Sequence, residues 1–250
     1  MPRGEVFHRI WLSMSSDAPG PVACVFDAYG TLFDFRGRVQ QHVATVAPSA
    51  DAALLVTRWR ETQLQYTWLR SLQGRYVNFE CVTADALDYA LESLSIVNAG
   101  LRDELLDLYW TVPVFDDAKH ALMKLHGSGV RCLILSNGTE RMIEAAAQAA
   151  GVRGLVDTIF SADAVGVYKP DARVYRLAVD ALDAPPERIL FVSANGWDAY
   201  GASAFGYRVV WCNRAGQTRE RLPGGPEQEV RSLDEIEEVL ASASSLDCET

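Results

Sequence analysis

The stretch VACVFDAYGTLFD, residues 22–34, decides the fold. It begins with an apolar run, residues 22–26, whose length and β-branched content are typical of a buried parallel strand. The run ends at Asp27, and Gly30 then allows the backbone to turn sharply. Aspartate is common in ordinary turns, yet a carboxylate at the C-terminal end of such a strand also lies where open α/β sheets bind ligands. The rest of the chain decides between these two interpretations.

Further apolar runs alternate with helical patterns along the chain. The expected strands are 130–135, 159–161, 189–192 and 207–211, and the expected helices around them are 116–125, 139–150 and 171–182. Strands that alternate with helices indicate a parallel sheet covered on both faces. The sequence therefore predicts an α/β protein with a Rossmann-like, doubly wound parallel sheet.

Residues 36–112 differ, because they contain helical patterns and no convincing strand. The expected helices are 51–72, 79–94 and 101–111, and the first repeats apolar residues every four or five positions. We expect a core domain made of 21–35 and 113–240, with 36–112 inserted as a helical cap subdomain. Residues 1–20 are expected to form a poorly ordered leader, with Met14 as an alternative start, and 241–250 a frayed tail.

The composition excludes several classes of function. The chain has 250 residues and a formal net charge of −10, which argues against nucleic acid or an anionic membrane as a partner. Its five cysteines are scattered without a CxxC pair, which indicates reduced thiols and a cytoplasmic protein. The four histidines show no metal-ligand spacing, and we expect neither a metal nor another cofactor.

Polar side chains follow three of the strongest expected strands, and Lys169 lies in a further connection. The clusters are Asp27, then Ser136 with Asn137, then Ser193 with Asn195 and Asp198. Because the C-terminal ends of parallel strands share one edge of a sheet, these groups should converge in one crevice. Their convergence favours a functional interpretation of Asp27 over that of a simple turn residue.

These segments carry a resemblance to a known superfamily. FDAYGTLFD (26–34), LSNG (135–138), YKPD (168–171) and SANGWD (193–198) resemble the four motifs of the haloacid dehalogenase superfamily. Within the insert, WRETQLQYTWLRSLQGRYVNF (59–79) is similar to the cap of the L-2-haloacid dehalogenases. The resemblance extends over roughly residues 20 to 235. It implies hydrolysis of (S)-2-haloalkanoic acids to (R)-2-hydroxyalkanoic acids and halide.

The resemblance also implies a role for each matching residue. Asp27 is expected to attack the substrate carbon, Lys169 to orient Asp27, and Asp198 to act as the general base. The expected positioning residues are Thr31, Tyr175, Ser193 and Asn195. The expected halide-binding residues are Arg60, Asn137 and Trp197. The substrate is expected to contact Ser136, Ala28, Tyr29, Leu64 and Phe79. Ala194 departs from the family pattern, where relatives have a second serine.

Two alternatives remain open. A Mg²⁺-dependent phosphatase of the same fold would carry a second aspartate two residues after the nucleophile, where this chain has Tyr29. A binding or scaffold protein on a catalytically dead fold is disfavoured by the complete set of Asp27, Lys169 and Asp198. We further expect a homodimer, because residues 51–72 carry more large apolar residues than one face of a small subdomain needs. The residues concerned are Trp59, Tyr66, Trp68 and Leu69.

Overall fold

The computed structural model describes residues 21–48 and 50–245, and the expected leader at 1–20 lies outside that part of the chain. Its centre is a six-stranded sheet in the order β3-β2-β1-β4-β5-β6, in which every paired neighbour is parallel. The strands are β1 (Ala23–Phe26), β2 (Arg131–Ser136), β3 (Thr158–Ser161), β4 (Ile189–Ser193), β5 (Arg208–Cys212) and β6 (Gln228–Val230). This topology confirms the doubly wound parallel sheet.

Strand β1 lies at the centre of the sheet, between β2 and β4. Its four side chains are fully buried, as expected for a continuous apolar run covered on both faces. The strand order reverses between β1 and β4, because the chain first winds outward through β2 and β3 and then returns. Phe26 is paired with Val192, so Asp27 emerges beside Ser193 at the edge where such sheets bind ligands.

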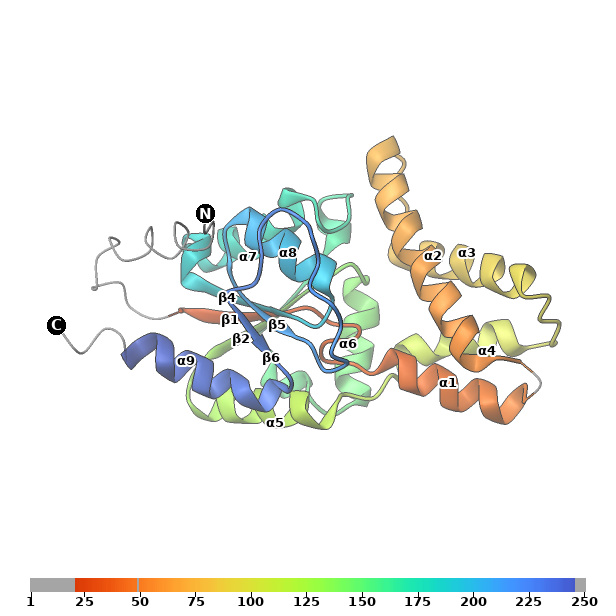
Figure 1. Cartoon of the computed structure of the whole chain (residues 1–250), viewed down its shortest axis with the longest axis horizontal. Coiled ribbons are helices and arrows are strands. Elements are labelled where there is room, and N and C mark those ends of the chain that lie inside the picture. Colours follow the sequence, from red (N-terminus) through yellow and green to blue (C-terminus); the bar gives the residue numbers. More distant parts are fainter. Residues whose placement is uncertain (1–20, 49, 246–250) are drawn as a thin grey trace, which may run out of the picture.

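Helices cover both faces of the sheet, with α7 and α8 on one face and α5 and α9 on the other (Figure 1). Their bounds are α5 (Asp116–Gly127), α6 (Glu140–Ala149), α7 (Ala172–Leu182), α8 (Gly196–Phe205) and α9 (Ile236–Ser245). Side-chain caps begin two of them. Thr139 accepts a hydrogen bond from the N–H of Met142, and Asp171 accepts one from the N–H of Arg173.

The remaining helices pack together beyond the C-terminal edge of β1 (Figure 1). They are α1 (Phe35–Val46), α2 (Ala52–Gln73), α3 (Phe79–Ser93), α4 (Leu101–Asp107) and the 3-10 helix η2 (Leu108–Trp110). A buried aromatic cluster joins them, since Trp59 of α2 contacts Phe35 and Tyr109 with ring centroids 5.1 and 5.6 Å apart. Across residues 21–48 and 50–245, no helix combines the length and hydropathy of a membrane span.

Three elements go beyond the sequence expectations. Helix α1 was not predicted, because its buried face consists of Phe35, Val39 and Val43 alone in an otherwise polar or small sequence. Strand β6 was also not predicted, and it has three residues, too few to show an alternating pattern. Helix α9 continues to Ser245, five residues past the boundary expected for the frayed tail.

Candidate active site

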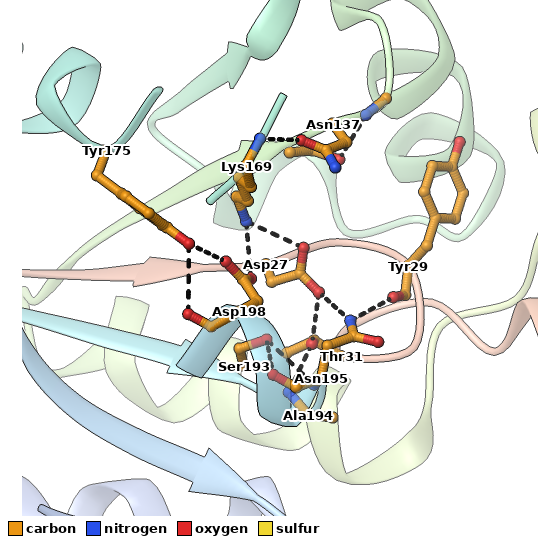
Figure 2. A network of polar contacts seen from close by, with 12 residues as sticks. Asp27, Tyr29, Thr31, Asn137, Lys169, Tyr175, Ser193, Ala194, Asn195 and Asp198 are labelled. Atoms are coloured by element: carbon orange, nitrogen blue, oxygen red, sulfur yellow. Dashed lines mark hydrogen bonds and ion pairs between the residues drawn. The ribbon is translucent and has the colours of Figure 1, made fainter. Parts of the chain in front are cut away.

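Lys169 joins two carboxylates at the switch point of the sheet (Figure 2). Its Nζ lies 3.1 Å from Oδ1 of Asp27 and 2.9 Å from Oδ2 of Asp198. Asp27 directly follows β1, Asp198 lies in the first turn of α8, and Lys169 lies in the connection before α7. Lys169 and Asp198 are fully buried and Asp27 is 6% exposed. The structure therefore brings the three residues together, as the sequence predicts.

The second oxygen of Asp27 is held by two donors. Thr31 Oγ1 donates to Oδ2 at 2.9 Å, and Asn195 Nδ2 donates to the same oxygen at 2.7 Å. Thr31 Oγ1 also accepts the N–H of Ala194 at 2.8 Å, so it connects the turn after β1 with the loop after β4. Together with Lys169, these donors restrict the rotation of the Asp27 carboxylate and stabilise its charge.

Asp198 has a different environment. Burial raises its pKa to about 6, with a contribution from the charge of Asp27, while Lys169 and a hydrogen bond from Tyr175 act in the opposite direction. Tyr175 OH donates to Oδ1 of Asp198 at 2.8 Å. Burial alone would lower the pKa of Lys169, but the two carboxylates together raise it above its ordinary value, so the ammonium remains charged. A carboxylate with a pKa just below neutrality suits a general base.

Three of the expected site residues form hydrogen bonds with main-chain groups in this structure: Asn137, Ser193 and Ser136. Asn137 Oδ1 accepts the N–H of Lys169 at 2.9 Å, which holds the lysine connection against the loop after β2. Ser193 Oγ accepts the N–H of Asn195 at 3.1 Å and donates to the carbonyl of Asn195 at 3.4 Å, and it forms no hydrogen bond with Asp198 or Lys169. Ser136 Oγ accepts the N–H of Gly138 at 3.0 Å, which leaves its own O–H available as a donor.

The backbone N–H groups after Asp27 are largely used within the turn itself. Those of Thr31, Leu32 and Phe33 bond to the carbonyl of Ala28, and that of Gly30 bonds to the carbonyl of Phe33. These four groups are therefore not free to bind a substrate carboxylate. Any backbone contribution from this segment must come from the N–H groups of Ala28 and Tyr29.

Tyr29 is 4% exposed and its ring points away from Asp27 (Figure 2). The ring stacks on Phe79 with centroids 6.3 Å apart and contacts Tyr109 edge-on at 4.9 Å. Its carbonyl accepts Asn195 Nδ2 at 3.2 Å. Phe79 is buried, whereas Leu64 of α2 is half-buried. The side chain at position 29 thus forms an apolar wall together with Phe79 of α3 and Tyr109 of η2.

A pocket of about 480 Å³ opens between helices α1 and α2 and the loops that follow β1, β4 and β5, and Arg60 lines it. Tyr29 and Asn195 line the same pocket, so it reaches the residue that bonds to Asp27. Arg60 Nη1 donates to Oε1 of Gln63 at 2.6 Å, and Gln63 in turn donates to Tyr109 OH at 2.9 Å. Gln63, which is fully buried, was missed from the sequence because a glutamine on a helix carries no distinguishing signal.

Two of the three expected halide-binding residues, Arg60 and Trp197, line different pockets in this structure. Trp197 lines a second, largely apolar pocket and packs edge-on against Trp68 with ring centroids 5.6 Å apart. No hydrogen bond or ring contact among the described residues links Trp197, Arg60 and Asn137. Trp197 Nε1 is buried without a hydrogen-bond partner in the described part of the chain, so it is an unused donor.

The carboxylate oxygens of this site are not arranged to bind a divalent cation. Both oxygens of Asp27 and both oxygens of Asp198 accept hydrogen bonds from Lys169, Thr31, Asn195 or Tyr175. Within residues 21–48 and 50–245, no group of three or more histidine, cysteine, aspartate or glutamate side chains is arranged to hold a metal ion. Mg²⁺ needs several oxygen ligands, whereas here a lysine ammonium takes the central position between the carboxylates.

Fold and site together define the class of protein, an α/β enzyme with a lysine-held aspartate in the crevice of a doubly wound sheet. The chain belongs to the haloacid dehalogenase-like hydrolases, whose family model matches residues 22–206. It is 40% identical to (S)-2-haloacid dehalogenase 1 of Pseudomonas sp. (strain CBS-3) over 219 residues, which cover 87% of this chain and 96% of that protein.

Two solved structures have the same fold over nearly their whole length. A dehalogenase in an intermediate complex shares 38% identity with a TM-score of 0.85, and the match covers 90% of this chain and 99% of that one. The L-2-haloacid dehalogenase of Xanthobacter autotrophicus, with chloropropionic acid covalently bound, shares 31% identity with a TM-score of 0.82 and 88% and 98% coverage. The second structure shows that this architecture accommodates a covalently bound haloacid.

Proposed function

We propose that this protein hydrolyses (S)-2-haloalkanoic acids to (R)-2-hydroxyalkanoic acids and halide. The observation that carries the proposal is the buried Asp27–Lys169–Asp198 arrangement, with Tyr29 packed into an aromatic cluster where a phosphatase of this superfamily needs a second carboxylate. The high identity to a protein named (S)-2-haloacid dehalogenase supports the substrate class.

In the first step Asp27 attacks C2 of the substrate from behind the carbon–halogen bond, and the halide leaves with the bonding electrons. An Asp27 carboxylate oxygen becomes bonded to C2 as the C2–halogen bond breaks, which gives an aspartyl ester and inverts the configuration at C2. Lys169, Thr31 and Asn195 hold the carboxylate in line, since each donates to it in the resting enzyme. A fixed near-attack geometry of this kind can contribute several powers of ten to the rate.

In the second step Asp198 removes a proton from water, which attacks the carbonyl carbon of the ester. The C–O bond to C2 stays intact, so the inverted configuration is kept and the product is the (R)-hydroxy acid. Asp198 is suited to this role because burial brings its pKa to about 6. Tyr175 and Lys169 fix the orientation of its carboxylate.

Halide binding is assigned to Arg60, Asn137 and Trp197. Arg60 places a cation at the pocket, and Trp197 Nε1 is a buried donor without a protein acceptor among the described residues. The substrate carboxylate is assigned to the Ser136 hydroxyl and the N–H of Ala28. The alkyl group is assigned to the wall formed by Tyr29, Leu64 and Phe79. In this assignment the cap, proposed as residues 36–112, supplies Arg60, Leu64 and Phe79, and the core, proposed as 21–35 and 113–240, supplies the other residues.

The decisive experiment is halide release from (S)-2-chloropropionate with and without EDTA. We expect release of chloride that is unaffected by EDTA, no release from the (R)-enantiomer, and no turnover by Asp27→Asn. Hydrolysis of a phosphate ester that is abolished by EDTA and restored by Mg²⁺ would replace this proposal with the phosphatase alternative. The absence of both activities in folded protein would favour the binding-protein alternative.

The partners follow from the same proposal: a small anionic haloacid, the halide product and a second copy of this chain. Trp59 is buried inside the cap, so it cannot contribute to a dimer, whereas Leu69 and Leu72 of α2 are 43% and 85% exposed. These two side chains support a homodimer through α2, and light scattering at micromolar concentration tests it. The four described cysteines are free, which supports a reducing, cytoplasmic location.

A further inference from the structure

Arg214 follows β5 and contacts the turn that carries the nucleophile. Its Nη2 donates to the carbonyl of Thr31 at 2.9 Å, and its Nη1 donates to the carbonyl of Gly30 at 3.2 Å. Its guanidinium also lies over the ring of Phe115, 4.3 Å from the centroid. Arg214 thus reaches, across the surface of the core, the two residues at the tip of the turn after Asp27.

The other side of the guanidinium is fixed by Asp117 of α5. Nε of Arg214 lies 2.8 Å from Oδ2 of Asp117 and Nη2 lies 2.9 Å from Oδ1, which is the bidentate geometry that gives an arginine one orientation. The N–H of Leu233 also donates to Asp117 at 3.0 Å. Burial would raise the pKa of Asp117, but Arg214 and the Leu233 N–H hold it below its ordinary value. Asp117 is therefore an ionised, immobile anchor.

The turn that Arg214 holds is the one that orients Asp27. Thr31 donates its hydroxyl to Asp27 Oδ2 while its own carbonyl is bound by Arg214. The Gly30 backbone has a φ of +89°, a conformation that costs most residues energy and that glycine adopts freely. A shift of this turn would displace the Thr31 hydroxyl and with it the Asp27 carboxylate.

We propose that Arg214, anchored by Asp117, is a positioning residue that keeps the turn at 28–33 in the geometry required for attack by Asp27. This inference rests on the proposed function for its effect on turnover, since Arg214 itself does not contact Asp27. Loss of the clamp misplaces the nucleophile, whereas Arg60, Asn137 and Ser136, which are assigned to the halide and the substrate carboxylate, lie outside this turn and stay in place. The consequence is a lower kcat with a nearly unchanged KM.

The test compares Arg214→Gln, Arg214→Lys and Asp117→Asn with the control Arg208→Gln. Arg208 lies on the same strand β5 and pairs with Glu227 at 3.3 Å, away from the turn. We expect Arg214→Gln to lower kcat for 2-chloropropionate by about 10- to 100-fold, because misplacement by about 1 Å can cost that much. KM should change by less than about threefold, and the control should behave like wild type. Arg214→Lys should recover part of the loss, since lysine keeps the charge but not the paired donors.

Hydrogen exchange of the peptide that contains residues 28–33 gives a readout independent of activity. Exchange should be faster in Arg214→Gln and in Asp117→Asn than in wild type and in Arg208→Gln. Folded Arg214→Gln and Asp117→Asn proteins with wild-type kcat would overturn the proposal. Wild-type protein that releases no halide would overturn the proposed function instead, and unchanged exchange of the turn would then overturn the clamp as well.

Discussion

The ammonium of Lys169 lies 2.9 Å from Oδ2 of Asp198, and both side chains are fully buried. Lys169→Met would leave two uncompensated carboxylates, Asp198 and Asp27, in the interior. Removing one partner of a buried ion pair costs about 3–5 kcal/mol, so we expect a loss of that size in the free energy of unfolding at neutral pH. Urea denaturation measures it.

Lys124→Met is the matched control for this substitution. Lys124 lies 3.7 Å from Glu237, and both side chains are about half exposed. An exposed pair contributes about 0–1 kcal/mol, so this variant should unfold almost like wild type. Equal destabilisation by the two lysine substitutions would show that the buried triad does not contribute to stability as its geometry implies.

Ester hydrolysis should be lost in acid. Burial raises the pKa of Asp198 to about 6, and a general base works only when deprotonated, so the hydrolysis rate should fall as pH drops through about 6. Rapid-quench kinetics separate this step from formation of the ester. A hydrolysis rate that is constant between pH 5 and 8 would contradict the assignment of Asp198.

Tyr175→Phe should raise the pH below which the rate of ester hydrolysis falls. The hydrogen bond from Tyr175 OH stabilises the ionised form of Asp198 and so lowers its pKa, and its removal lets the pKa rise. The pH profile of single-turnover hydrolysis measures the shift. Tyr175 is fully buried, so the melting temperature of the variant must be recorded beside its profile. If the hydrolysis rate of the variant falls at the same pH as that of wild type, Tyr175 does not act through Asp198.

Arg60→Ala should impair turnover more than binding. Negative charge develops on the halide mainly in the transition state, so loss of a donor that stabilises it should lower kcat by about 10²- to 10³-fold and change KM less. Arg58→Ala is the control, because Arg58 is exposed on the same helix. Steady-state halide release measures kcat and KM of the two variants. An Arg60→Ala enzyme as active as Arg58→Ala would exclude the halide role.

The oxygen of the first product should come from Asp27. A single turnover in ¹⁸O water with enzyme in excess should give unlabelled hydroxy acid and a labelled peptide containing Asp27, because water attacks the ester carbonyl. Mass spectrometry of both fractions measures this. Label in the first product and none in the protein would instead indicate direct attack by water on the substrate carbon, with an aspartate as the general base.

The positions of several site residues can be predicted from the sequence, because these residues follow the C-terminal ends of strands. Asp27, Asn137 and Asn195 come one to three residues after apolar runs, and parallel strands bring such positions to one edge whatever the loops do. The convergence of Asp27, Lys169 and Asp198 in one crevice is predicted on these grounds, and in the structure Lys169 Nζ lies 3.1 Å from Asp27 and 2.9 Å from Asp198. That Trp197 and Arg60 line different pockets was not predictable, since it depends on how α2 packs against the loops of the sheet.

By itself, the sequence determined the parallel sheet, the inserted helices and the family, because these depend on local patterns and on motifs a few residues long. The tertiary structure alone decided which partner each polar group takes. Arg214 and Thr31 are 183 positions apart, and Gln63 and Tyr109 are 46 apart. The periodicity of the sequence does not predict such pairs, because their hydrogen bonds form only after apolar burial has brought distant elements together.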